Sequence, residues 1–223
     1  MRYPLIVAVD DKSCSKGLLS TISDLSRMAS GVKVGVPTLI SCGLGFLRDL
    51  RASAKDALVI ADLKLADVGD VMVKTASLVK GYVDAIIAHA FVGRSGALDQ
   101  LSESAKKWGL KLVLVASMSH PGSLEFYDVV FEGVLRLIND VGPWGVVAPA
   151  TRPQVVSSIR RLLPHVKILA PGIGAQGARP GEAICAGADY EIVGRAVLGS
   201  PDPARALNEL GEAASRCLAA RSL

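Results

Sequence analysis

The sequence predicts an α/β fold, a (β/α)8 TIM barrel formed as a single domain by residues 1–223. Eight short apolar runs alternate with eight helical segments, and this number fits the chain length. Half of the residues are hydrophobic but only 4% are aromatic, so the core must consist of Val, Ile, Leu and Ala, as in buried parallel strands. No linker or shift in composition divides the chain. The competing doubly wound sheet lacks its G-x-G-x-x-G signature in the first strand–helix turn.

The apolar runs and the segments between them give the expected elements in order. Strands are expected at 5–9, 32–35, 57–62, 84–89, 111–116, 145–148, 166–170 and 190–194. Helices are expected at about 14–29, 38–54, 69–80, 95–108, 152–163 and 203–219, with one helix reaching 140 after a long loop and a short one ending near 186.

Composition also excludes several classes of function. The net charge of +4 is modest and no basic run is present, so a nucleic-acid partner is not expected, whereas a small anionic substrate is compatible. No apolar run approaches the ~20 residues that cross a bilayer, so no membrane association is expected. The first residues lead directly into a strand, without the pattern of a signal peptide, and a cytoplasmic location is expected.

The four cysteines are Cys14, Cys42, Cys185 and Cys217. They form no C-x-x-C pair, and their spacing matches no zinc site. We therefore expect small, buried, apolar residues in a reducing compartment.

The residues at the carboxyl ends of the expected strands are charged or polar, while the strands are apolar. Active sites of such barrels lie at this end. The residues concerned are Asp10, Lys33, Asp62, Lys64, His89, Ser119, Pro149, the segment 171–181, Gly194 and Arg195.

The third strand ends in the segment 62–67, which reads DLKLAD. Residues two apart in an extended strand share a face, so Asp62 and Lys64 are expected to project together, and Asp67 follows where a helix begins. A charged surface turn is the alternative. Lys33 lies within an apolar strand and is either a lysine that reaches solvent from the strand's edge or a cation inside the barrel mouth. In the second case Asp10, Lys33, Asp62 and Lys64 form an array of paired charges.

The seventh strand is followed by a glycine-rich loop, residues 171–177, with the sequence PGIGAQG. Loops after the seventh and eighth strands of such barrels commonly hold a phosphate, and glycines let backbone N–H groups approach it. Gln176 can donate an amide N–H, and Arg195 can bind a phosphate with two N–H groups. These positions predict a phosphate site.

The segment 118–122, MSHPG, follows the fifth strand. Adjacent Ser and His residues rarely form a nucleophile–base pair, so Ser119 is better interpreted as a hydrogen-bonding group for a planar ligand. His89 and His120 are expected to be structural, and His165 to lie on the surface.

These residues together resemble the orotidine 5′-monophosphate decarboxylase family in its short microbial form, over almost the full chain. The resemblance rests on Asp10 and on the segments 33–35 (KVG), 62–67 (DLKLAD), 118–122 (MSHPG), 171–177 (PGIGAQG) and 193–195 (VGR), in that order.

The resemblance implies decarboxylation of orotidine 5′-monophosphate to uridine 5′-monophosphate, in pyrimidine synthesis, without a cofactor or metal. Asp62 would lie beside the substrate carboxylate, and Lys64 would protonate carbon 6. Lys33 and Asp10 would hold the ribose and complete the charge array.

The resemblance also implies a homodimer, in which Asp67 reaches the neighbouring subunit's site with Val68 beside it. Ser119 would bind the pyrimidine. Gln176 and Arg195 would hold the phosphate, with the 171–181 loop closing over it. The remaining substrate-binding positions would be Pro171, Gly172, Gly174 and Gly194.

One position departs from the family pattern and two alternatives remain. Val71 stands where the family often has a Thr that touches a ribose hydroxyl, so that contact is in doubt unless Asp70 replaces it. The related Mg²⁺-dependent enzymes 3-keto-L-gulonate 6-phosphate decarboxylase and hexulose-phosphate synthase use a Glu on the second strand, where this chain has Lys33, a cation that would repel a metal. A non-catalytic phosphate-binding barrel would not need Lys64 flanked by carboxylates.

Overall fold

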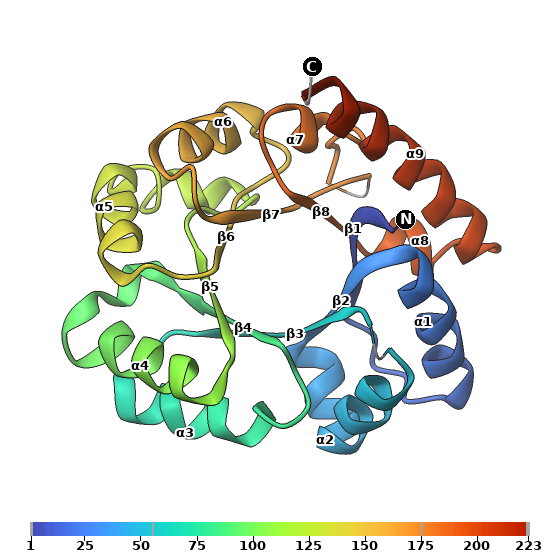
Figure 1. The fold of residues 1–223 in the computed structure, drawn as a ribbon, viewed down its shortest axis with the longest axis horizontal. Helices are drawn as coiled ribbons and strands as arrows, with labels where there is room; N and C mark the ends of the chain where they lie inside the picture. The colour runs from blue at the N-terminus through green and yellow to red at the C-terminus, as the bar shows by residue number, and fades with distance from the viewer. Residues whose placement is uncertain (1, 55, 175, 222–223) are drawn as a thin grey trace.

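The computed structural model describes residues 2–54, 56–174 and 176–221 and shows a closed barrel of parallel strands (Figure 1). Each strand pairs with its neighbours in chain order, and the last strand pairs with the first. The strands are β1 (Tyr3–Val9), β2 (Ala29–Gly35), β3 (Leu58–Leu65), β4 (Ala85–His89), β5 (Lys111–Val115), β6 (Gly145–Val147), β7 (Lys167–Pro171) and β8 (Tyr190–Val193). The predicted (β/α)8 fold is confirmed.

Helices form the outer ring around the strands (Figure 1). They are α1 (Lys16–Met28), α2 (Val36–Ser53), α3 (Gly69–Val79), α4 (Asp99–Trp108), α5 (Phe131–Val141), α6 (Pro153–Leu162), α7 (Glu182–Cys185), α8 (Arg195–Leu198) and α9 (Pro203–Arg221). Short helical turns lie at η1 (Ala90–Val92), η2 (Arg94–Leu98) and η3 (Pro121–Leu124).

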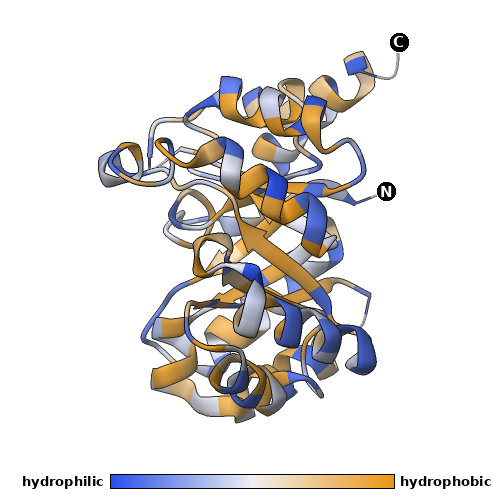
Figure 2. Cartoon of the chain, turned by 90° about the vertical axis from the view of Figure 1, so that its left-hand side faces the viewer, coloured by the Kyte–Doolittle hydropathy of each residue, from blue (hydrophilic) through white to orange (hydrophobic). Residues whose placement is uncertain are grey.

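Strand residues alternate between two cores, because successive side chains of a strand point to opposite faces. In β1, Ile6 and Ala8 fill the inside of the barrel, whereas Leu5, Val7 and Val9 pack under the surrounding helices. Figure 2 shows the apolar strands in the middle of the molecule and helices with mixed polar and apolar surfaces around them. Full burial of one such aliphatic side chain stabilises the fold by about 1.5–3 kcal/mol.

The structure differs from the predicted elements mainly at strand and helix ends. β3 continues past Asp62 to Leu65, so the charged segment begins inside the strand. The short helix α8 directly after β8 was not predicted, because its four residues are too few to show a helical period. α2 is kinked at Gly43, which has φ +67°.

The expectation that the cysteines are buried and reduced is wrong. Cys14 is bonded to Cys42 and Cys185 to Cys217, and no free cysteine remains in the described ranges. Cys14 and Cys185 are exposed, and their partners are half-buried.

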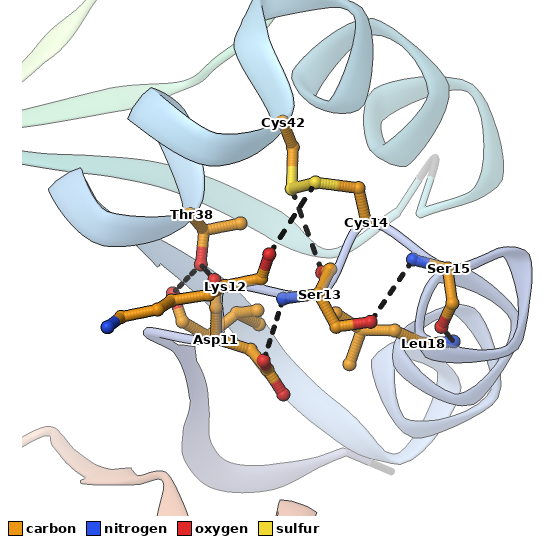
Figure 3. Close-up of a disulfide and its surroundings, with 9 residues drawn as sticks. Asp11, Lys12, Ser13, Cys14, Ser15, Leu18, Thr38 and Cys42 are labelled. Atoms are coloured by element: carbon orange, nitrogen blue, oxygen red, sulfur yellow. Dashed lines mark hydrogen bonds between the residues drawn. A yellow bond between two sulfur atoms is a disulfide. The ribbon is translucent and has the colours of Figure 1, made fainter.

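Tertiary structure explains why spacing did not reveal these bonds. The paired cysteines lie 28 and 32 residues apart, but the barrel brings the loop after β1 beside α2, and α7 against α9. The Cα atoms are then 5.4 and 4.9 Å apart, within the range that a disulfide spans. Figure 3 shows how the first bond ties the β1–α1 loop to α2.

None of the helices described is both long enough and apolar enough to cross a membrane.

Candidate active site

A cavity of about 750 Å³ opens at the carboxyl ends of the strands. Ten of the predicted site residues line it: Asp10, Lys33, Asp62, Lys64, Ser119, Pro171, Gly172, Gln176, Gly194 and Arg195. Strand alternation explains the position of several of them. Asp62 follows the inward-facing Ile60 by two residues, and Asp10 follows the inward-facing Ala8, so each is the next inward position towards the mouth.

The charged side chains form the predicted array around a single carboxylate. Asp62 Oδ2 accepts hydrogen bonds from Lys33 Nζ at 2.8 Å and from Lys64 Nζ at 2.7 Å. Lys33 Nζ also lies 3.5 Å from Asp10 Oδ2. Lys33 and Asp62 are 6% and 4% exposed, so the interpretation of Lys33 as a lysine reaching solvent from the strand's edge is wrong. The interpretation of segment 62–67 as only a surface turn is wrong for the same reason.

Asp62 is held as an anion. Burial would raise the pKa of the Asp62 carboxyl, but the ammonium groups of Lys33 and Lys64 outweigh it, and the pKa lies below its ordinary value. Its second oxygen, Oδ1, is buried and has no hydrogen-bond partner among the described residues. A buried unpaired oxygen is costly in a folded protein, and it occurs here on a residue that lines the cavity.

The backbone at Lys64 is unusual. Lys64 has φ +43°, the only positive φ of a non-glycine residue in the described chain. β3 advances from Ala61 to Leu65 while β4 advances only from Ile86 to Ala88, so the strand bulges at this point. The predicted meeting of Asp62 and Lys64 is confirmed, but a left-handed residue in a bulge, rather than regular alternation, directs the lysine. Such a conformation costs about 1–2 kcal/mol.

Ser119 lies in a braced segment after β5. Arg152, which precedes α6, donates to the carbonyl of Met118 and to Ser117 Oγ, both at 2.6 Å. Its other nitrogen pairs with Asp128 at 2.5 Å. Arg152 also donates to Ser123 Oγ at 3.3 Å. These four contacts from one guanidinium fix the backbone just before Ser119. Sequence reasoning missed this arginine, since its partners come from a distant loop.

His89 ends β4, and its ring nitrogen Nδ1 shares a hydrogen bond with the hydroxyl of Tyr127. Burial and the nearby Lys64 ammonium both lower the pKa of His89, so the ring is neutral at pH 7. Burial raises the pKa of Tyr127. The pair supports the predicted structural role of His89. His120 and His165 are exposed, as was predicted for His165.

The loop after β7 is folded back on itself by backbone hydrogen bonds between its own residues. Gly174 N donates to Ala178 O at 3.0 Å, and Ala178 N donates to Gly172 O at 3.2 Å. Gly172 has φ +118°, and a Cβ there would lie 3.2 Å from both Gln176 and Thr151. Glycine is therefore required for this turn. Residue 175 of the predicted 171–181 loop lies outside the described residues.

Arg195 opens α8 beside this loop. A Cβ on Gly174 would lie 3.2 Å from the Cβ of Ala196, so the loop approaches α8 closely. Arg195 is exposed and lines the cavity together with Gln176 and Gly194. Gly174 does not line the cavity itself. The structure thus brings the predicted phosphate-binding side chains to one side of the mouth.

Asp67 and Val68 do not line the cavity of their own chain. Asp67 Oδ1 accepts the backbone N–H of Val68 at 2.7 Å, and Val68 is 60% exposed at the start of α3. Val71 is also exposed on α3, and Asp70 pairs with Lys74.

Several cavity residues were missed by sequence reasoning. Five apolar residues of the wall come from the barrel strands: Ala8, Ile87, Val115, Val147 and Ile192. All are inward-facing residues of the barrel, and the period of two along each strand could have identified them. Lys12 and Asp11 also line the cavity, from the loop after β1, where no regular pattern applies.

No group of three or more His, Cys, Asp or Glu side chains within the described ranges is arranged to hold a metal ion.

Comparison with known proteins assigns the family. Residues 3–210 match the family model described as "Orotidine 5'-phosphate decarboxylase / HUMPS family". The chain belongs to this family. A relative from Aeropyrum pernix named orotidine 5′-phosphate decarboxylase is 48% identical over 96% of this chain and 89% of its own length. A relative of the same name from Methanosarcina barkeri is 38% identical and covers 92% of each chain.

Solved structures of the family have the same fold. The orotidine 5′-monophosphate decarboxylase of Sulfolobus solfataricus matches with a TM-score of 0.90 and 30% identity, over 97% of this chain and 100% of its own. The Methanocaldococcus jannaschii enzyme complexed with the inhibitor BMP matches with a TM-score of 0.87 and 29% identity, over 96% of this chain and 98% of its own.

Proposed function

We propose that this protein decarboxylates orotidine 5′-monophosphate to uridine 5′-monophosphate in pyrimidine synthesis. The observation that carries the proposal is the buried Asp62 carboxylate shared by the ammonium groups of Lys33 and Lys64 at the barrel mouth. Family membership and the names of the relatives support it.

The cavity suggests how the substrate would lie. Arg195 and Gln176 would hold the phosphate, with Pro171, Gly172 and Gly194 forming the backbone around it. Gly174, which does not line the cavity, would shape the turn of this loop with its positive φ. Ser119 would hydrogen-bond the pyrimidine. Asp10 and Lys33 would hold the ribose between these ends.

Lys64 would act on the reacting carbon. The bond from carbon 6 to the carboxylate breaks, carbon dioxide leaves, and the electron pair stays on carbon 6. An ammonium ~4 Å away stabilises such an anion by about 4 kcal/mol at an effective dielectric near 20. Lys64 then donates a proton to carbon 6 and regains one from solvent. No electron acceptor or metal is needed to balance this step, so we propose that no cofactor takes part.

Asp62 would have two effects. It fixes both ammonium groups before the substrate arrives, so little energy is lost in reorganising charges during the reaction. Its Oδ1 has no hydrogen-bond partner among the described residues, and a substrate carboxylate beside it would be a like-charge contact that is relieved when carbon dioxide leaves.

We further propose a homodimer in which Asp67 and Val68 complete the neighbouring subunit's site. Five exposed apolar residues lie near the starts of the elements that follow β2, β3 and β4, which are next to one another around the barrel. They are Val36, Ile40, Val68, Val71 and Phe91, from 38% to 79% exposed. Exposed apolar side chains on neighbouring elements are typical of a protein interface.

The cytoplasmic location stays a prediction. The two disulfides mean that reduced thiols no longer support this location. They do not contradict it either, because intracellular proteins of hyperthermophiles also carry disulfides.

One assay tests the reaction. The purified protein is incubated with orotidine 5′-monophosphate in EDTA, and the loss of the substrate's absorbance is followed. We expect turnover that EDTA does not change. Absence of turnover would contradict the proposal, and EDTA-sensitive turnover of a sugar phosphate would favour the Mg²⁺-dependent relatives.

A further inference from the structure

The loop after β1 lies beside the proposed phosphate-binding residues. β1 pairs with β8, with Val7 opposite Val193, so the segments that follow the two strands are neighbours. A Cβ on Gly194 would lie 3.4 Å from the carbonyl oxygen of Ala8. Lys12, in the loop after β1, lines the same cavity as Arg195, together with Leu198 and Gly199 of the β8 side.

The backbone around Lys12 is fixed on both sides. The hydroxyl of Thr38, which is fully buried, donates to the carbonyl of Asp11 at 2.7 Å and lies 3.1 Å from the carbonyl of Val9. Two residues after Lys12, the disulfide of Cys14 anchors the loop to α2 (Figure 3). A side chain on a fixed backbone loses less entropy when it binds a ligand.

The charge of Lys12 is free for a ligand. Asp62 already engages Lys33 and Lys64, whereas neither Lys12 nor Arg195 forms an ion pair with any residue the structure describes. The adjacent Asp11 turns its carboxylate into its own loop, where Oδ1 accepts the N–H of Ser13 at 2.8 Å. In Figure 3 the side chains of Asp11 and Lys12 point in different directions.

A phosphate monoester carries up to two negative charges at pH 7, and Arg195 supplies one positive charge. We propose that Lys12 is a second cationic ligand of the substrate's phosphate and binds it from the β1 side, while Arg195 binds it from the neighbouring β8 side. This proposal rests on the proposed function, because it takes a 5′-phosphate as the group that is bound.

The test compares Lys12→Met with Lys16→Met, which removes an equal charge from the first residue of α1, outside the cavity. Three constants are measured: the KM for orotidine 5′-monophosphate, the inhibition constant of inorganic phosphate, and that of uridine, which lacks a phosphate. We expect Lys12→Met to raise the first two about tenfold, the effect of losing one charge-assisted hydrogen bond, and to leave the third unchanged. Lys12→Arg should restore most of the loss, and Lys16→Met should behave as the parent does.

Two results would overturn the proposal. The first is an unchanged KM and phosphate constant in Lys12→Met. The second is an equal rise for phosphate and uridine, which would mean that the substitution only distorts the loop. If the parent protein does not turn over orotidine 5′-monophosphate, the proposed function fails, and calorimetric titration of parent and variants with inorganic phosphate still decides whether Lys12 binds it.

Discussion

Removal of the Cys14–Cys42 disulfide should destabilise the protein by an amount that the structure allows us to calculate. The bond joins residues 28 positions apart and so closes a loop of that size in the unfolded chain. Loop-closure entropy for about 30 residues corresponds to ~3.6 kcal/mol at 25 °C. For a protein of this size, such a loss lowers the melting temperature by roughly 7–14 °C. The double substitution Cys14→Ser with Cys42→Ser should therefore produce a large and easily measured shift.

The assay is urea unfolding followed by circular dichroism, with and without a thiol reductant. The second bond, Cys185–Cys217, spans 32 residues and has a similar calculated contribution of ~3.7 kcal/mol. Reductant should destabilise the parent by about the sum of both, and the double variant only by the second. Parent and variant should consequently converge in reductant.

Thiol titration of the unfolded protein provides the matching chemical measurement. No reactive thiol should be found before reduction and four after it. Four reactive thiols in the unreduced protein, together with unfolding curves that reductant does not move, would refute the reasoning.

Three further predictions concern the site, and a fourth concerns the proposed dimer interface. Lys64→Ala should reduce kcat for orotidine 5′-monophosphate by at least about a hundredfold, since general-acid catalysis contributes that much. Its circular dichroism spectrum should not change. Activity near the parent's would mean that the proton donor is misassigned. Arg195→Ala should raise KM by about tenfold or more with a smaller change in kcat, and unchanged kinetics would remove its phosphate role. The ionised Asp62 stabilises the folded state above its ordinary pKa of 3.8, and this contribution is lost as the pH falls through the lower pKa of the folded state. Asp62→Asn should therefore make the free energy of unfolding fall less steeply below about pH 4, and urea unfolding at a series of pH values measures this. Ile40→Asp, at an exposed position, should convert the proposed dimer to a monomer in sedimentation velocity, with Lys16→Asp as the control. An unchanged sedimentation coefficient would contradict the proposed interface.

The barrel and the charged end of β3 could be predicted because both depend on short-range patterns. Apolar runs of strand length identify the strands, and a period of two places Asp62 inward at the mouth. Lys33 could be recognised because a charge inside an apolar strand needs a partner, and Asp62 on the neighbouring strand supplies one.

The remaining features depend on contacts between distant segments. The disulfides join residues that only the closed barrel brings together. The brace that Arg152 provides to the segment before Ser119 links the loops after β5 and β6. The left-handed backbone of Lys64 arises from the pairing of β3 with β4, which is not visible in the sequence of β3 alone.

The bulge at Lys64 and the unpaired oxygen of Asp62 have a consequence for engineering. A left-handed lysine and a buried acceptor without a partner each lower the stability of the free protein. Natural proteins keep such features where function requires them, and substitutions that relieve them commonly raise stability. Variants selected only for heat resistance should therefore tend to replace Lys64 and lose activity. Asp62 is a poorer target, because its ionised carboxylate compensates the buried ammonium of Lys33. A selection for a more durable catalyst has to hold both residues constant and seek its gains in the outer helices.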